Sequence, residues 1–191
     1  MDVKTVCIAD NVWKFTCDSN VYLLQLKEHI VVIDTGRSEN KKALRLQLEK
    51  IVPLSSVDIV LFTHLHYDHI SNADLFSHAI FYASKDSIAS LQQDRSGAIL
   101  HPSVVQQFSA VLHPFEELLL PELEVISTPG HTLGSVCFFY PEKKILFSGD
   151  TLFLNTTGRT DLPFSDASAM KKSLQRLKKL DYNILCPGHE Y

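Results

Sequence analysis

The sequence predicts a layered α/β fold with two β-sheets or one strongly split sheet, and three observations favour it. Short apolar runs of strand length alternate with amphipathic runs of helix length. Strands come first, a helix and mixed segments follow, and strands and a helix return near the end. Apolar residues make up 45% of the 191 residues and charged residues 21%, close to globular averages. We therefore expect a single domain over residues 1–191.

The first third of the chain carries the signals of a hairpin and a helix. The elements predicted here are strands at 12–17, 21–26 and 30–33 and a helix at 40–51. Asp18-Ser19-Asn20 is expected to form the turn of a hairpin between the first two strands, and the third strand leads into Asp34-Thr35-Gly36. Ser38 is expected to cap the helix, and Pro53 stands just beyond its end.

The rest of the chain continues the alternation of strands and helices. Strands are predicted at 57–62, 79–83, 122–126, 136–140, 144–147 and 183–186, and a final helix from Ser165 or Asp166 to Leu180. The run at 57–62 is almost continuously apolar, which suits a strand buried on both faces. Residues 84–113 are less regular, with helical segments broken at His101-Pro102 and His113-Pro114. We expect this stretch to be an insertion that covers a site.

Charge and composition narrow the classes of partner. The net charge of −4 argues against a nucleic-acid-binding surface. No stretch approaches the ~18 consecutive apolar residues of a membrane span, and the start of the chain, Met1-Asp2-Val3-Lys4, lacks the pattern of a signal peptide. The four cysteines form no C-x-x-C pair, so we expect a cytoplasmic protein with reduced thiols. The sequence leaves the oligomeric state open.

A dense cluster of histidines points to a metal site. The run His64-Leu65-His66-Tyr67-Asp68-His69 has an expected chance frequency on the order of one in a thousand in a chain of this composition. Imidazole and carboxylate groups are ligands for zinc and also for iron or manganese. Side chains two apart in an extended loop point the same way, so His64 and His66 can bind one ion. Asp68 and His69, past the turn, can face a second.

Three further candidates stand at strand ends. His131, Asp150 and His189 each follow a glycine, which permits tight turns and close approach of the backbone. Together with the histidine run they supply five imidazoles and two carboxylates. Two ions with about four ligands each need roughly this many donors if one carboxylate bridges them. The other four histidines, His29, His78, His101 and His113, lack such spacing and are expected at the surface or beside chain breaks.

These residues carry a family resemblance that spans most of the chain. The motifs are Thr63-His64-Leu65-His66-Tyr67-Asp68-His69, Pro129-Gly130-His131-Thr132, Ser148-Gly149-Asp150-Thr151 and Pro187-Gly188-His189. In this order they resemble the metallo-β-lactamase fold superfamily, and the resemblance implies a four-layer αββα sandwich with a metal centre at one edge of the two sheets. One departure is Ser71-Asn72, where the family often has two glycines. Because asparagine tolerates a positive φ, we expect the glycine turn to be kept.

The resemblance also implies roles for the candidate residues. The first metal would be held by His64, His66 and His131, the second by Asp68, His69 and His189, and Asp150 would bridge them. Asp34 matches a family position that supports the site from behind. Asp68 would orient the attacking hydroxide and later move a proton. Arg159 is expected to bind a substrate carboxylate, and Tyr67 to reach the substrate or pack beneath the site.

Two activities fit this set of residues. Gly158-Arg159-Thr160-Asp161-Leu162-Pro163 and the ending Gly188-His189-Glu190-Tyr191 are similar to segments of glyoxalase II-like hydrolases. This implies hydrolysis of a thioester or ester of a small molecule by a metal-bridging hydroxide, with two zinc ions as the first expectation. The first of these segments is also similar to one in persulfide dioxygenases, which implies the alternative of a single iron held by His64, His131 and Asp150.

Overall fold

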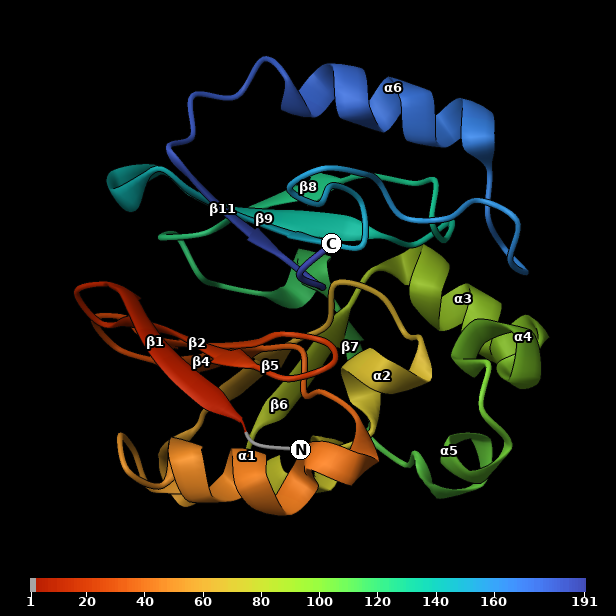
Figure 1. Ribbon diagram of the computed structural model, residues 1–191. Helices are drawn as coiled ribbons and strands as arrows, with labels where there is room; N and C mark the ends of the chain where they lie inside the picture. The colour runs from red at the N-terminus through yellow and green to blue at the C-terminus, as the bar shows by residue number, and fades with distance from the viewer. Residues whose placement is uncertain (1–2) are drawn as a thin grey trace.

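The strands of the computed structural model, which describes residues 3–191, form two β-sheets that pack face to face (Figure 1). The first sheet has the order β1-β2-β3-β4-β5-β6-β7 and the second β11-β10-β9-β8. The first contains β1 Lys4–Ala9, β2 Val12–Thr16, β3 Val21–Gln25, β4 Ile30–Ile33, β5 Ile59–Leu61, β6 Ile80–Ala83 and β7 Leu112–Pro114. The second contains β8 Glu124–Ser127, β9 Val136–Tyr140, β10 Ile145–Gly149 and β11 Ile184–Pro187.

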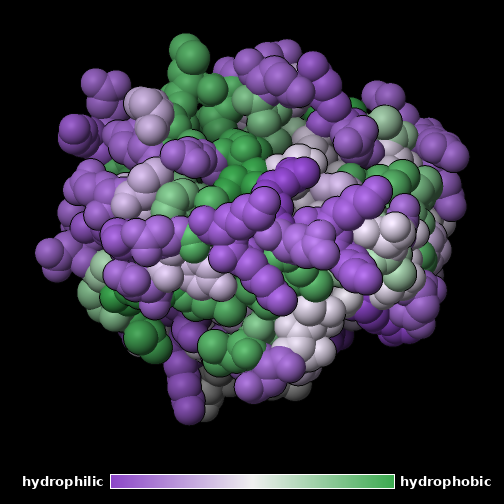
Figure 2. Space-filling model, turned by 90° about the horizontal axis from the view of Figure 1, so that it is seen from above, coloured by the Kyte–Doolittle hydropathy of each residue, from purple (hydrophilic) through white to green (hydrophobic). Residues whose placement is uncertain are grey.

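Helices cover the outer faces of both sheets, so the molecule has four layers, as the resemblance implied (Figure 1). The helices are α1 Lys41–Leu48, α2 Tyr67–Ile70, α3 Lys85–Gln93, α4 Arg95–Ile99, α5 Pro102–Gln107 and α6 Ala167–Leu177. Helix α1 lies against the first sheet and α6 against the second. Seen from above, the molecule presents mainly hydrophilic side chains with smaller hydrophobic areas between them (Figure 2).

Strand alternation explains the three hydrophobic layers. In β9, Phe138 and Tyr140 point into the core between the sheets, while Cys137 and Phe139 face the α6 side. In β5, Val60 faces the helices below the first sheet while its two neighbours face the second sheet. Because successive side chains of a strand point to opposite faces, a strand covered on both faces must be apolar throughout. This confirms the expectation for the run at 57–62.

The predicted elements are largely confirmed, but α1 ends at Leu48 rather than at Ile51, and three further points are corrected. The helical segment begins at Ser38 itself, as a 3-10 turn over Ser38–Asn40, so Ser38 does not cap α1 as expected. Helix α6 ends at Leu177 rather than Leu180, and its cap is Asp166, whose side chain accepts from two backbone N–H groups. Asn72 has φ −108°, so the expected positive φ is wrong there. Its side-chain amide instead donates to the carbonyls of Thr35 and Arg37.

Two strands lie where the sequence indicated none. β1 is an exposed edge strand of the first sheet. β7 is a short edge strand that ends at Pro114, a residue at which the sequence predicts a break in regular structure. Proline is tolerated at a sheet edge because its missing N–H has no neighbour to bond. Within residues 3–191, none of the helices is long and apolar enough to cross a bilayer. The prediction about a signal peptide concerns Met1-Asp2-Val3-Lys4, of which Met1 and Asp2 lie outside the described residues.

Candidate metal centre

The seven predicted ligands meet at one edge of the sandwich. His64, His66, Asp68 and His69 follow β5 of the first sheet, and the last two lie on α2. The other three leave β8, β10 and β11 of the second sheet. β10 and β11 run parallel with Gly149 opposite Pro187, so Asp150 and His189 emerge side by side. Both sheets therefore contribute side chains to a single cluster.

A first group of three imidazoles is compact and buried. One ring nitrogen of each of His64, His66 and His131 lies within 4.8 Å of the others. Nδ1 of His66 is 2.9 Å from Nε2 of His131. The three residues are at most 4% exposed, so they are shielded from bulk solvent. Imidazole nitrogens converging in this way suit a divalent ion such as zinc or iron.

A second group joins a carboxylate to two imidazoles. Oδ2 of Asp68 lies 3.3 Å from Nε2 of His189 and 3.9 Å from Nε2 of His69. Their ligand atoms also fall within 4.8 Å of one another. The main-chain carbonyl of Asp68 accepts a hydrogen bond from the hydroxyl of Ser19, which fixes the start of α2 against the hairpin turn. This group mixes nitrogen and oxygen donors.

Asp150 lies between the two groups. Its Oδ1 is 3.3 Å from Nε2 of His69. Its Oδ2 is 3.5 Å from Nε2 of His131 in the first group and 3.5 Å from Nε2 of His189 in the second. A carboxylate in this position can contact ions on both sides.

Two glycines make this close approach feasible. Gly149 has φ +48°, a left-handed conformation, and a Cβ at this residue would lie 2.6 Å from Cβ of Thr63. A Cβ on Gly188 would collide with Oδ1 of Asp150. The glycines before Asp150 and His189 are therefore needed for space as well as for the turn.

Hydrogen bonds at Nδ1, on the side of each ring away from the cluster, fix the orientation of His69 and His64. Nδ1 of His69 is 2.8 Å from Oδ2 of Asp34, and a carboxylate only accepts, so Nδ1 donates and Nε2 faces the site. Asp34 also accepts from the backbone N–H and the hydroxyl of Thr63, and that hydroxyl contacts Nδ1 of His64 at 3.1 Å. Asp34 is 2% exposed and has φ +56°, which is uncommon outside glycine. Its predicted supporting role therefore has a direct geometric basis.

Main-chain carbonyls orient two more of the predicted ligands, and the sequence did not indicate these contacts. Nδ1 of His131 donates to the carbonyl of Arg159 at 2.9 Å, and Nδ1 of His189 donates to that of Asp18 at 2.6 Å. In both rings Nε2 is thereby turned toward the cluster. No residue type marks such a carbonyl in a sequence, so only the tertiary fold reveals it.

Several buried polar atoms of the cluster have no hydrogen-bond partner. They are Nε2 of His64, His66 and His69 and Oδ1 of Asp150. The last two lie 3.3 Å apart and form an ion pair, whereas Nε2 of His64 and Nε2 of His66 have no such partner, although buried polar atoms are nearly always hydrogen-bonded. Cations coordinated by these atoms would satisfy them, and the chemistry of the donors suits divalent transition metals.

The first group holds neutral imidazoles at neutral pH. Burial lowers the pKa of His64 well below its ordinary value and that of His66 to about 3. Burial also lowers the pKa of His131. Metal ligation requires the neutral ring, so these three side chains are ready to bind an ion without losing a proton.

In the second group, neighbouring carboxylates favour the protonated form of both imidazoles. Burial opposes charge on His69, yet Asp150, Asp34 and Asp68 together hold its pKa well above the ordinary value. At His189, burial by itself would lower the pKa, but hydrogen bonds to Asp150 and Asp68 outweigh it and raise the pKa to about 9. An ion entering this group must therefore displace protons.

The two predicted substrate-binding residues have other neighbours here. The guanidinium of the exposed Arg159 pairs with both carboxylate oxygens of Asp161, at 2.7 and 2.8 Å. The ring of Tyr67 lies between the guanidinium of Arg37, 5.4 Å away, and the ring of His101, 5.0 Å away. The contact between His101 and Tyr67 is not indicated by the sequence. It brings residues 84–113 against the loop that carries the ligands.

Comparison with known proteins gives the family. The model of the Metallo-beta-lactamase superfamily matches residues 15–85 and 93–189. A probable metallo-hydrolase of Streptococcus pyogenes serotype M6 is 33% identical over 186 residues, covering 89% of this chain and 78% of the relative. A hydroxyacylglutathione hydrolase of Bartonella tribocorum is 35% identical over 139 residues, which are 69% of this chain but only 48% of that protein.

A solved structure extends the likeness to three dimensions. TTHA1623, whose crystal structure is in a di-iron-bound form, is 31% identical with a TM-score of 0.70, covering 91% of this chain and 88% of that one. Sequence motifs, layered architecture and the cluster of buried imidazoles and carboxylates agree with these matches. The chain belongs to the metallo-beta-lactamase superfamily and is a metal-dependent hydrolase of that superfamily.

Proposed function

We propose that this chain hydrolyses a thioester or ester of a small molecule, with two divalent metal ions, zinc in the first instance. The observation that carries the proposal is the position of Asp150, whose two oxygens lie within 3.5 Å of imidazoles from both groups. An arrangement with donors on two sides and one shared carboxylate suits a pair of ions better than a single one.

The proposed residues would have separate roles in metal binding and proton transfer. His64, His66 and His131 would hold one ion, Asp68, His69 and His189 the other, and Asp150 both. When bound, such ions act as Lewis acids and bring the pKa of a water molecule to about 7. Asp68 is the most exposed of the seven ligand side chains, at 15%, so it can hold a proton during attack on the carbonyl and pass it on.

Substrate recognition by Arg159 and Tyr67 belongs to the same proposal. Asp161 holds the Arg159 guanidinium by two parallel hydrogen bonds, the geometry with which arginine binds any carboxylate. A substrate carboxylate would take the place of Asp161. Tyr67 lies between two proposed ligands in the chain, and its ring would form part of the wall beside them.

The relatives support hydrolysis of a thioester but do not identify the metal. One relative is named hydroxyacylglutathione hydrolase, although this chain spans about half of its length. The di-iron form of TTHA1623 shows that a similar fold accommodates iron. The alternative of a mononuclear-iron persulfide dioxygenase therefore enters the experiment as a competing outcome.

Metal content and substrate preference test the proposal together. Elemental analysis of purified protein should give about two ions per chain, and a panel of thioesters, esters and persulfides should show hydrolysis without oxygen uptake. The double variant His64→Ala with Asp150→Ala should lose both metal and activity. His78→Ala, which removes an exposed histidine, is the matched control and should change neither. One iron per chain with oxygen consumption, or hydrolysis retained by the double variant, would refute the proposal.

A further inference from the structure

The turn between β2 and β3 supplies none of the seven proposed ligands, yet it contacts two of the segments that carry them. This turn, Asp18-Ser19-Asn20, leads directly into β3 of the first sheet. Ser19 and Asn20 are both fully buried, with exposed fractions of 0%. Polar side chains of a hairpin turn ordinarily face water, so two buried ones indicate partners elsewhere in the fold.

Asn20 joins the first sheet to the end of β11 in the second. Its backbone N–H donates to the carbonyl of Gly188 at 2.6 Å. Its side-chain amide donates to the carbonyl of Pro187 at 3.0 Å and to Oε1 of Glu190 at 2.6 Å. A carbonyl and a carboxylate only accept, so the NH2 group must face both of them, and an aspartate could not replace this asparagine. Three hydrogen bonds from one residue thereby anchor the residues on both sides of His189.

Two further hydrogen bonds hold the same segment. The phenol of the buried Tyr22 donates to the carbonyl of Pro187 at 2.6 Å. His189 itself donates through Nδ1 to the carbonyl of Asp18 at 2.6 Å. Residues 187–190 are thus tied to the first sheet at several points, and a displacement of the His189 ring would break at least one of these hydrogen bonds.

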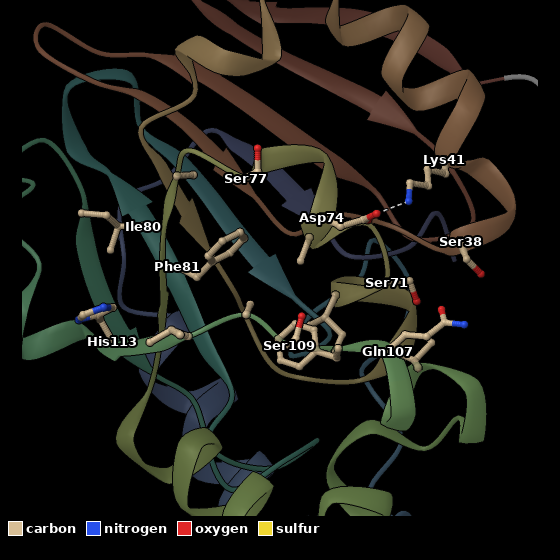
Figure 3. Close-up of a pocket in the computed structure, with 17 residues that line it drawn as sticks. Ser38, Lys41, Ser71, Asp74, Ser77, Ile80, Phe81, Gln107, Ser109 and His113 are labelled. Carbon is tan, nitrogen blue, oxygen red and sulfur yellow. Dashed lines mark hydrogen bonds and ion pairs between the residues drawn. The ribbon is translucent and has the colours of Figure 1, made fainter.

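The same turn also holds Asp68 on helix α2. The hydroxyl of Ser19 donates to the main-chain carbonyl of Asp68. Helix α2 is a single turn of four residues, which has little stability by itself. Beyond its last residue, Ile70, the chain borders a hollow of about 780 Å³ that Ser71 and Asp74 help to line (Figure 3). Because the protein is hollowed on that side, the position of α2 depends more strongly on hydrogen bonds such as the one from Ser19.

The first group of imidazoles has different supports. His64 is oriented through the hydroxyl of Thr63, and His131 through a main-chain carbonyl of its own. Among residues 3–191, no hydrogen bond joins the 18–20 turn to the loops that carry these two rings or His66. A change in the turn should therefore disturb the second group and leave the first intact.

We infer that the 18–20 turn, with Asn20 as its main positioning residue, holds Asp68 and His189 in place for one of the two proposed ions. This inference rests on the proposed function, because it needs two ions with separate supports. Ligands generally have to lie within about 0.5 Å of the productive geometry. Asp68 and His189 come from loops of different sheets, and the turn contacts the chain at both. Without that contact, the ion of this group should bind about 10- to 100-fold more weakly, the usual cost of losing such support, and the other ion should stay.

Ion counting in Asn20→Asp tests this inference, because the change keeps the shape of the side chain and removes its donor. The zinc-loaded chain is equilibrated at a series of free zinc concentrations set by a chelating buffer, and native mass spectrometry counts the ions on each chain. One dissociation step should shift by about tenfold or more while the other changes by less than about threefold. When Asp68→Ala has already removed a ligand of the second group, Asn20→Asp should have little further effect.

Two control variants separate positioning from general effects. Asn183→Asp makes the same chemical change at an exposed residue and should change neither step. Val52→Ala removes buried methyl groups from the layer beneath the first sheet and so lowers the free energy of unfolding. It should nevertheless leave both dissociation steps as they are, because it touches neither the turn nor a ligand.

Reversal of one hydrogen bond provides a rescue. Glu190→Gln alone should have little effect, because the amide oxygen still accepts from Asn20 and the lost ion pair with Lys14 is partly exposed. Combined with Asn20→Asp it should recover part of the lost affinity, because the new amide can donate to the new carboxylate. Ser19→Ala, which removes only a hydroxyl, should weaken the same step and serves in place of Asn20→Asp if circular dichroism shows that variant unfolded.

The outcomes separate this inference from the function on which it rests. A native chain that binds a single zinc ion would refute the proposed function and this inference with it. If the native chain binds two ions and Asn20→Asp shifts both steps equally or neither of them, the inference alone is overturned. It is also overturned if Asn20→Asp weakens the remaining ion of Asp68→Ala as strongly as it does in the native chain.

Discussion

Replacement of Asp34 by asparagine isolates the role of one hydrogen bond in metal binding. Asparagine has the shape of aspartate and tolerates the φ of +56° found here, so the backbone is not strained by the change. Its Oδ1 can still accept from the N–H of Thr63. Where the carboxylate had Oδ2, however, the amide presents N–H groups toward the hydroxyl of Thr63 and toward Nδ1 of His69.

The consequence for His69 can be estimated from this geometry. In the neutral ring that metal ligation requires, two opposed donors are avoided only if the hydrogen lies on Nε2, which is the nitrogen that faces the cluster and would then be unable to bind an ion. Loss of such a supporting partner typically costs about 10- to 100-fold in metal affinity, or about 1.4 to 2.7 kcal/mol. The effect on His64 should be smaller, because the Thr63 hydroxyl between them can rotate to keep one hydrogen bond.

Competition with a chromophoric chelator measures this effect. Metal-free protein is titrated with zinc, and two binding steps are expected in the native chain. Asp34→Asn should weaken one step by 10- to 100-fold while changing the other by only a few-fold. Asp10→Asn makes the same chemical change at an exposed residue and is the control. If Asp34→Asn binds two ions with native affinity, the hydrogen bond to His69 does not govern ligation and the reasoning is wrong.

Three further predictions follow from the packing and charges of the site. Gly188→Ala should displace the Asp150 carboxylate and reduce the bound metal, measured by elemental analysis, while circular dichroism shows a folded protein. Loading the metal-free protein at pH 7.5 should release between about two and three protons. His189, with a pKa raised to about 9, and His69 are charged there and must become neutral, and a water bound to the proposed ions, with a pKa of about 7, is mostly ionised; calorimetry in buffers of different ionisation enthalpy measures the release, and none at all would contradict the assignment. Burial raises the pKa of Cys137 to about 11, so its thiolate fraction is small and alkylation at pH 8 should proceed only as fast as the protein opens, which mass spectrometry can follow.

Much of this architecture follows from local patterns in the sequence. Apolar runs without polar interruption predicted strands buried on both faces, and glycines before Asp150 and His189 predicted the tight exits of β10 and β11. The edge strand β1 was missed because most of its residues are exposed and carry no periodic signal. β7 was missed because Pro114 indicates a break wherever the strand's place in the sheet is unknown.

The features of the candidate site that the sequence did not predict also depend on the tertiary structure. The donors could be found because imidazole and carboxylate groups are rare in such a dense arrangement, whereas the groups that orient them, apart from Asp34, carry no signal in the sequence. Thr63 and the carbonyl of Asp18 act through contacts that exist only after folding. The pairing of Arg159 with Asp161 depends on the conformation of the loop that carries both residues. The conformation of Asn72 depends on its hydrogen bond to the main-chain carbonyl of Thr35, a residue distant in the sequence.

The distribution of donors over both sheets would give the proposed ions a structural role beside their chemical one. An ion held jointly by the loops after β5 and after β8, β10 and β11 would link the two sheets at their shared edge. Any species that binds only the folded form stabilises it, by about 2.7 kcal/mol when present at a hundredfold excess over its dissociation constant. If the proposed ions bind, removing metal would lower the stability of the folded chain as well as its activity, so resistance to proteolysis should fall together with metal content.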